Sequence, residues 1–179
     1  LTGKSKFGIS YLFQPFFVQQ LGIFSQSLLS QDEVENFIMS IPKKYKVIKY
    51  RLNEFNKVYQ DWKFIKLHRN VELDLIYDYK YLYNNYSKNT KRNLAKAEFA
   101  RLSINKNVNA NDVIQLFRNN RGKDVTHWKD DEYVRLLDLI ETAIYHECCF
   151  IVGANDADGQ LIAGAVFMCS HDRIIFLFS

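Results

Sequence analysis

Three apolar runs near the end of the sequence, separated by short polar turns, constrain the fold of this chain more than any other feature. The runs are residues 149–154, 161–169 and 174–178, and the turns are 155–159 and 170–172. Because connections this short join neighbouring strands as hairpins, the pattern predicts three antiparallel strands. Each run is apolar on both faces, so helices are expected on both sides of the sheet, and the helix that covers one side is expected to lie outside this sequence.

Two helices are expected before these strands, after a short strand at 102–104. Asn109 is placed to cap the first helix, which ends at Arg121-Gly122-Lys123. The second begins at Asp130 with three acidic residues that suit the helix dipole. Their apolar stripes are Val113, Leu116 and Phe117 in the first helix, and Tyr133, Leu136, Leu137, Ile140 and Ile144 in the second.

Residues 1–78 predict a first lobe with the outline β-α-β-β. Its helix opens with a capping box, Ser30 to Glu33, and stops at Pro42. Strands are expected within 7–24 and over 45–52 and 64–75. Residues 79–100 then predict a linker helix, interrupted by the polar residues 87–90. Residues 101–179 form the second predicted lobe.

The composition limits the class of protein but does not identify a function. A hydrophobic fraction of 47% in 179 residues supports a folded core. A formal net charge of +4 requires no polyanion site. The three cysteines form an odd set, so we expect buried free thiols in a reducing, cytoplasmic setting. We expect no membrane span, and both ends of the sequence are expected to be cut from a longer protein.

Two segments carry a resemblance to a known family. Residues 85–97, Asn-Tyr-Ser-Lys-Asn-Thr-Lys-Arg-Asn-Leu-Ala-Lys-Ala, resemble the linker helix of Fem-like, double-lobed proteins of the GNAT fold. Residues 11–16 and 19–24 are similar to the first lobe of bacterial members of that group, and the element order over 101–179 resembles the opening of the GNAT acyltransferase fold. The resemblance implies an α/β (α+β) class: a mixed, largely antiparallel sheet flanked by helices, with an incomplete second lobe.

The resemblance also implies an activity. It suggests transfer of an acyl or aminoacyl group, from acetyl-CoA or aminoacyl-tRNA, to the amine of a small molecule or peptide. The strand at 174–178 corresponds to the one that lies beside the donor, so Phe176, Leu177 and Phe178 are the implied cofactor-binding residues. The glycine-rich turn that would bind the donor's pyrophosphate is expected after Ser179. No cofactor is therefore expected to be bound by these residues alone.

The family places an acceptor-binding loop between its first two helices. Here the implied acceptor-binding residues are Arg121, Lys123, His127 and Trp128. His127 is a weak candidate for the general base, since an imidazole titrates close to neutral pH. A solvated or hydrogen-bonded loop histidine is the commoner role, and Trp128 is as readily a packing anchor.

A basic run upstream offers a second kind of site. Lys88, Lys91, Arg92 and Lys96 follow several tyrosines and are candidates to bind phosphates of a tRNA end or of a nucleotide-linked precursor. The alternative is a solvated helix face, which the nearby Glu98 favours. No metal site is predicted, because Cys148 and Cys149 should point to opposite faces of a strand.

Two other functions remain open at this point. The chain is a non-catalytic GNAT-fold binding module or pseudo-enzyme if the donor loop is lost, or a nucleic-acid-binding protein if the basic helix is the functional surface. An unpaired apolar edge on the strand at 174–178 would also pair with a second copy, which makes a homodimer a further expectation.

Overall fold

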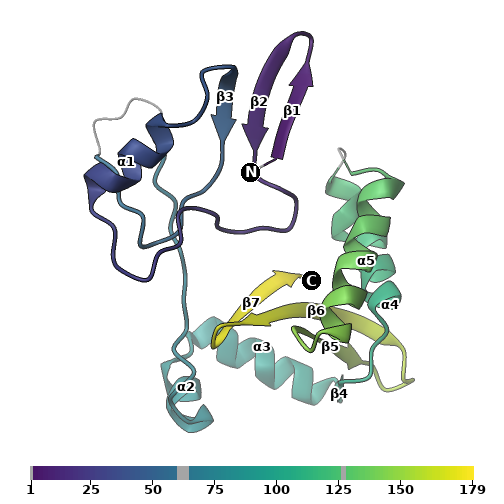
Figure 1. Cartoon of the computed structure of the whole chain (residues 1–179). Helices are drawn as coiled ribbons and strands as arrows, with labels where there is room; N and C mark the ends of the chain where they lie inside the picture. The colour runs from purple at the N-terminus through teal and green to yellow at the C-terminus, as the bar shows by residue number, and fades with distance from the viewer. Residues whose placement is uncertain (1, 60–64, 126–127) are drawn as a thin grey trace. The chain divides into compact units, whose positions relative to one another are not determined.

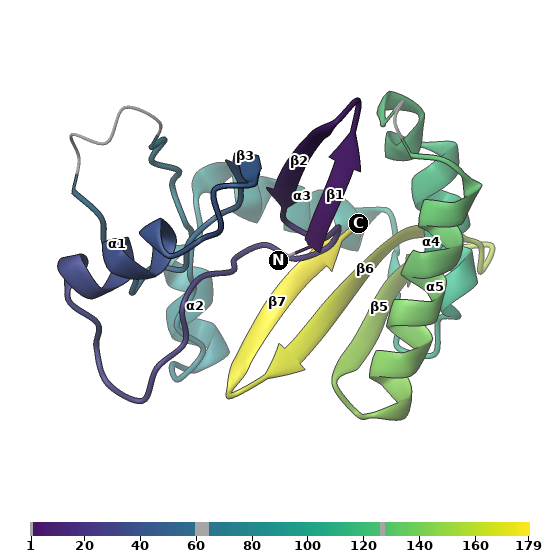
Figure 2. The same ribbon diagram turned by 45° about the horizontal axis from the view of Figure 1, so that its top comes forward.

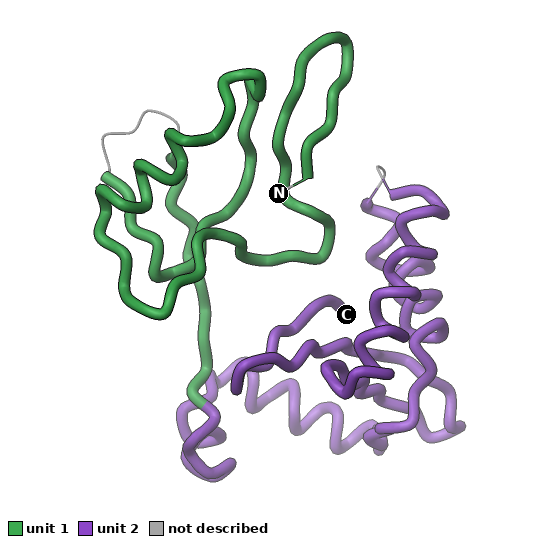
Figure 3. The backbone as a smooth tube through the Cα atoms, viewed as in Figure 1, with its two compact units in different colours: residues 1–74 green, residues 75–179 purple. Residues whose placement is uncertain are grey.

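The computed structural model describes residues 2–59, 65–125 and 128–179. They form two compact units, 1–74 and 75–179, drawn in different colours in Figure 3. The expected linker, 79–100, is included in the second unit. Both units combine helices with a small sheet, so the predicted α+β class is confirmed.

The first unit contains a three-stranded sheet. β1 (Thr2–Lys6) and β2 (Ile9–Phe13) form an antiparallel hairpin, and β3 (Tyr45–Lys49) pairs parallel to β2. Phe7 and Gly8 both have positive φ, 51° and 76°, as a tight hairpin turn requires. The hairpin partner β1 was not predicted, because Thr2–Lys6 is a polar, fully exposed strand with no apolar alternation.

The strand predicted over 64–75 is wrong for residues 65–75, which are neither strand nor helix. Val71, Leu73 and Leu75 alternate with polar residues, yet their side chains are 83%, 61% and 57% exposed. An alternating pattern specifies a strand only where one face is buried against a core. This segment has no such face, so the unit reads β-β-α-β instead of β-α-β-β.

The helix of the first unit, α1 (Gln31–Met39), begins with the predicted capping box. The Ser30 hydroxyl accepts a hydrogen bond from the Glu33 N–H, and the Ser30 N–H donates to the Glu33 carboxylate over 2.8 Å. Val34 is fully buried and anchors the helix, whereas Phe37 on the predicted apolar face is 61% exposed.

The second unit is built on a four-stranded antiparallel sheet with the order β4-β5-β6-β7 (Figure 1). The strands are β4 (Ser103–Asn105), β5 (Cys149–Asn155), β6 (Leu161–Ser170) and β7 (Arg173–Phe178). The three strands predicted from the apolar runs are therefore confirmed, as is their antiparallel pairing.

Two helices cover one face of this sheet. α4 (Ala110–Asn119) packs against β6, α5 (Asp130–Tyr145) packs against β5, and the 3-10 turn η1 (Arg121–Asp124) follows α4 (Figure 2). The shared core consists of almost completely buried aliphatic side chains: Val113, Ile114, Leu136, Ile140 and Val166. Gly164 lets α4 approach closely, since a Cβ there would lie 2.8 Å from a Val113 methyl group.

The expected linker helix is two helices, α2 (Tyr79–Asn85) and α3 (Lys88–Phe99). Tyr86 is extended, with ψ 143°, and ends α2, while the Ser87 hydroxyl accepts from the Thr90 N–H and caps α3. The polar residues predicted to interrupt one helix therefore begin another, because Ser is a strong N-cap residue. Neither helix contains a buried residue.

The face of the sheet opposite α4 and α5 carries a row of aromatic rings. Phe150 stacks on Phe167 at 5.0 Å, and Phe167 lies 5.7 Å from Phe176. Phe150 and Phe176 are 39% and 47% exposed. Helices α4 and α5 thus cover one side of the sheet, while this row on the other side stays partly open to solvent, in line with the expectation that the helix covering one side lies outside this sequence.

All three cysteines are free thiols, as expected, but Cys148 is exposed instead of buried. It lies just before β5, after the turn that ends α5, and not inside the strand. Cys149 and Cys169 are half-buried. Among the described residues, no helix is both long enough and apolar enough to cross a membrane.

Candidate functional site

A pocket of about 270 Å³ lies where α4 and η1 meet the sheet of the second unit. Its lining residues come from α4, η1, β6 and the position after β7: Val113, Leu116, Phe117, Asn120, Arg121, Ile162, Ala163, Gly164 and Ser179. Most of these groups are apolar. The polar lining residues are Asn120, Arg121 and Ser179, and the Asn120 amide donates to the Leu116 carbonyl. With the Arg121 guanidinium as its charged donor, the pocket suits a molecule with an apolar part and an anionic part.

An aromatic chain fixes the helix side of this pocket. Phe117 lies 5.3 Å from Phe178 of β7 and 5.7 Å from Trp128, and Trp128 lies 5.4 Å from Tyr133 of α5. Two of these contacts are edge-to-face, a favourable geometry for aromatic pairs. Phe117 therefore joins the expected acceptor loop to the expected donor strand.

Charged groups hold the connection between α4 and α5 in place. Arg118 forms an ion pair with Asp130 and lies over the Tyr133 ring, 4.9 Å from its centroid. Gly122 allows η1 to pass close to the same ring, because a Cβ there would lie 2.7 Å from the Tyr133 hydroxyl. Arg121 is thus placed at the pocket by a connection that several contacts constrain.

The strands beside the pocket contain two irregularities of register. Phe167 pairs with Phe176 but Val166 pairs with Phe178, so Leu177 is an extra residue in β7. Ala154 pairs with Ala163 but Asn155 pairs with Leu161, so Ile162 is an extra residue in β6. Bulges leave a residue out of the ladder and bend the strand. Ile162 also lines the pocket.

The predicted acceptor-binding residues have different locations. Arg121 lines the pocket. Lys123 is exposed on η1 and does not line it. Trp128 is half-buried within the aromatic chain, the packing role that was its alternative. His127, the candidate base, lies outside the described residues.

The three predicted donor-strand residues face different environments. Phe178 is 8% exposed and packs on Phe117, on the helix side of the sheet. Phe176 belongs to the aromatic row on the opposite face. Leu177, at the bulge, is half-buried. Side chains of β7 thus pack on both faces, and its backbone is the part of the strand that lies at the sheet edge.

The predicted phosphate-binding residues belong to a separate surface. Lys88, Lys91, Arg92 and Lys96 all lie on α3, and none lines the pocket. Lys91 is the most constrained of the four, because its ammonium donates to the Asn84 carbonyl over 2.8 Å and lies 5.3 Å from the Tyr83 ring. The structure therefore does not bring the acceptor-binding and phosphate-binding candidates into one site.

Sequence reasoning missed several residues of the pocket. Asn120, Ile162, Ala163 and Gly164 were not singled out, although they line it. A glycine inside an apolar strand indicates close approach of another element, so Gly164 was the one recognisable signal. Asn120 ends α4 with its amide donating to the Leu116 carbonyl over 2.8 Å, which no sequence pattern specifies.

Ionisable groups near the site are sparse. Arg121 is the only charged side chain in the pocket lining, and no carboxylate or imidazole is among those lining residues. The backbone N–H of Lys129 holds the pKa of Glu132, in the first turn of α5, below its usual range. Within 2–59, 65–125 and 128–179, no group of three histidine, cysteine or acidic residues is placed to hold a metal.

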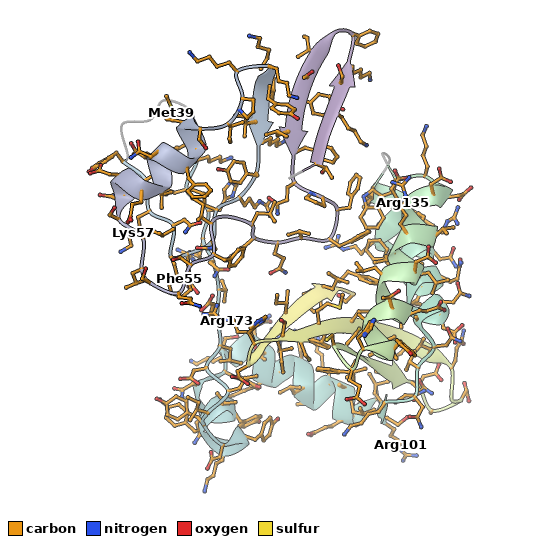
Figure 4. The ribbon with its side chains drawn as sticks, viewed as in Figure 1. Met39, Phe55, Lys57, Arg101, Arg135 and Arg173 are labelled. Carbon is orange, nitrogen blue, oxygen red and sulfur yellow. The ribbon has the colours of Figure 1, made fainter. Side chains whose placement is uncertain are left out.

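A second cavity, of about 240 Å³, lies in the first unit between residues 23–29 and 53–56. Asn56 organises it: its amide nitrogen donates to the Ile23 carbonyl over 3.0 Å, and its amide oxygen accepts from the Ile23 N–H over 2.7 Å. Phe55, labelled in Figure 4, is 52% exposed beside it. Because both polar atoms of the Asn56 amide bond to the Ile23 backbone, the residue connects the two segments around the cavity and is not left to bind a ligand.

Comparisons of the chain with protein-family models, with curated proteins and with solved structures find no match in any of the three. The functional argument therefore depends on the geometry of the pocket and of β7.

Proposed function

We propose that this protein is an N-acyltransferase of GNAT-like architecture, which transfers an acyl or aminoacyl group from acetyl-CoA or aminoacyl-tRNA to an amine. One observation carries the proposal. The order β4-α4-α5-β5-β6-β7 forms one antiparallel sheet with both helices on the same face, and a pocket with Arg121 lies beside the bulged strand β7. This arrangement agrees with the resemblance seen in the sequence.

The bulge at Leu177 supports a role for β7 in binding the donor. A residue out of the ladder register presents its N–H and C=O at an angle that regular pairing does not allow. Backbone N–H groups are suited to hydrogen-bond a thioester or ester carbonyl and to stabilise the charge that develops on its oxygen. In this proposal the transfer is a direct attack by a bound amine, helped by proximity.

The pocket supports binding of the amine acceptor. Its apolar wall, with Phe117 and Leu116, suits a hydrophobic side chain, and the Arg121 guanidinium suits a carboxylate on the same molecule. An amine that carries a carboxylate, such as an amino acid or a short peptide, is therefore the acceptor class proposed. Since free thiols persist in reducing compartments, the cytoplasm is the proposed location.

A second candidate function has its own observation. Among the residues that the structure describes, the side chains lining the pocket include no carboxylate or imidazole to accept the proton of the amine. This favours a binding module that retains the fold and holds an amine ligand without transferring an acyl group to it. The two functions differ in whether an amide product forms.

The test is an amide-formation assay with the full-length protein. Labelled acetyl-CoA and aminoacyl-tRNA are each supplied with a panel of amino acids and peptides, and the product is identified by mass spectrometry. Arg121→Ala should raise KM for the acceptor about tenfold, equivalent to about 1.4 kcal/mol of lost binding, with little change in kcat. Lys123→Ala, an equal change of charge outside the pocket lining, is the matched control.

The outcomes separate the two functions. An amide product whose KM depends on Arg121 supports the transferase. Acceptor binding by calorimetry without product under either donor supports the binding module. If the wild-type protein neither binds the acceptor panel nor forms product, both proposals are wrong.

A further inference from the structure

The charge of the chain is concentrated in one short segment. Residues 79–101 contain six basic side chains and one acidic side chain, a net charge of +5, whereas the whole chain has +4. The remainder is therefore slightly acidic. The net charge of the whole chain predicts no polyanion site, yet α2 and α3 form a strongly basic region.

The structure places these charges on a particular face of α3. At about 100° per residue, Lys88, Arg92, Lys96 and Phe99 fall within an arc of about 80°. All four side chains are exposed, and Phe99 is 91% exposed. The half-buried residues of the helix, Lys91, Leu94 and Ala97, lie on the opposite side. The basic face is therefore directed toward solvent.

Glu98, which favoured a merely solvated helix, does not interrupt this face. It lies about 120° from the centre of the arc. The Arg92 guanidinium donates to the Asn89 side-chain oxygen over 2.6 Å, which positions it along the helix instead of pairing it with an acid. Figure 4 shows Arg101 at the end of α3 that is distant from α2, so basic groups extend over about 18 Å of helix.

Exposed tyrosines lie just before α2 and within it. Tyr77, Tyr79 and Tyr81 are 50%, 65% and 51% exposed, and Tyr77 stacks on Tyr81 at 4.4 Å. Lys91, on the half-buried side of α3, lies over Tyr83 and connects the two helices next to each other in the chain. Single-stranded nucleic acids are bound by this combination, because cations follow the phosphates while aromatic faces stack on unpaired bases. An anionic membrane would need the charges but not the exposed ring planes.

We infer that the α2–α3 surface, defined by Lys88, Arg92, Lys96, Phe99 and the exposed tyrosines, binds single-stranded nucleic acid. None of these residues lines the pocket, so the inference can fail while acyl transfer from acetyl-CoA stands. It leaves open whether the sugar is ribose or deoxyribose, because phosphate contacts and stacking are common to both.

The experiment is fluorescence anisotropy of the full chain with labelled single-stranded RNA and DNA of one mixed sequence, repeated across a salt series. Wild type should bind with an affinity that falls steeply as salt rises. The triple variant Lys88→Ala, Arg92→Ala, Lys96→Ala should lose at least tenfold in affinity and about 2 units of the log–log salt slope, at roughly 0.7 per phosphate contact.

Two matched controls make the test specific. Replacing Lys43, Lys44 and Lys46 by alanine changes the charge equally on an exposed segment of the first unit and should leave binding unchanged. Phe99→Ala should weaken binding severalfold with the salt slope retained, because stacking releases no counterions. Phe7→Ala, at a ring that is also 91% exposed, is its control.

Several outcomes would overturn the inference. No binding by a wild-type protein with native circular dichroism contradicts it. So does equal loss in the two triple variants, which would indicate nonspecific attraction. Tighter binding to a duplex of the same sequence, or to phosphatidylserine vesicles, would assign the basic face to a different polyanion. RNA and DNA bound unequally would only identify the sugar, with the inference upheld.

Discussion

The ring of Phe117 lies edge-to-face against the ring of Phe178, with centroids 5.3 Å apart and planes at 71°. One residue belongs to α4 and the other to β7, so this contact connects the helix beside the pocket to the strand proposed to bind the donor. This contact therefore links the helix and the strand of the proposed site directly.

Energetic coupling between Phe117 and Phe178 is the first prediction. Each alanine variant should lower the free energy of unfolding, and the double variant should lose less than the sum by about 0.5–1.5 kcal/mol. Urea denaturation followed by circular dichroism measures the cycle. Phe117→Ala combined with Phe99→Ala serves as control, since Phe99 is 91% exposed and the two effects should add. Additivity in the Phe117–Phe178 cycle would show that the contact contributes nothing.

Replacing Gly164 tests the close approach of α4 to β6. A Cβ at this position would lie 2.8 and 2.9 Å from the two methyl groups of Val113, a branched side chain with little freedom to move. Gly164→Ala should therefore cost about 1–3 kcal/mol of unfolding free energy. Val113→Ala introduced alongside it should recover part of that loss. If the two substitutions simply add, the predicted clash is absent.

The three thiols should react at different rates with iodoacetamide. Cys148 is exposed, whereas burial, and to a lesser degree Cys169, raises the pKa of Cys149. Because the thiolate is the reactive form, Cys149 should be alkylated several times more slowly than Cys148 at neutral pH and should accelerate as pH rises. Peptide mass spectrometry after timed quenching follows each site. Equal rates at Cys148 and Cys149 would contradict the burial of the latter.

Acid should weaken two helix starts. Hydrogen bonds from Ser30 and from the Lys129 N–H lower the pKa values of Glu33 and Glu132 below 4.5 in the folded chain. A carboxyl with a depressed folded pKa adds stability that is fully present above its unfolded pKa and is lost as pH falls through the folded value. Stability should therefore decline below about pH 4.5. Glu33→Gln and Glu132→Gln should each flatten that decline, measured as urea midpoints across pH, and an unaltered slope would exclude this role.

Most elements of the second unit were predictable because their signals are local. The apolar runs at 149–178 and the stripes of α4 and α5 specify burial within a few residues, and Asn109 caps α4 as expected, accepting from the Asn111 N–H over 2.8 Å. The failures lie where local pattern and tertiary burial disagree. Val71 to Leu75 alternate without a core to face, and Cys148 falls one residue outside the strand that would have buried it.

The pocket was only partly predictable for the same reason. Arg121 was singled out through the family resemblance, but Asn120 and Ile162 become neighbours only when α4 is placed on β6. The register of the strands also determines which residues lie side by side near the pocket. The bulges at Ile162 and Leu177 cannot be recognised from the residue types. The basic run of α3 was recognised in the sequence, but only the structure shows which of its side chains share one exposed face and that Lys91 lies on the other side.

The strand pairings also carry information about the order in which the second unit folds. β6 follows β5 after a short turn and β7 follows β6 after two residues, whereas β4 reaches β5 through Ser103 paired with Asn155, across both helices. Contacts between residues close in sequence form fastest, because closing a long loop costs conformational entropy before the contacts at its ends add stability. The β5–β7 meander should therefore be structured first and β4 should dock last. Pulsed hydrogen exchange during refolding should protect the Val166 amide before that of Ile104.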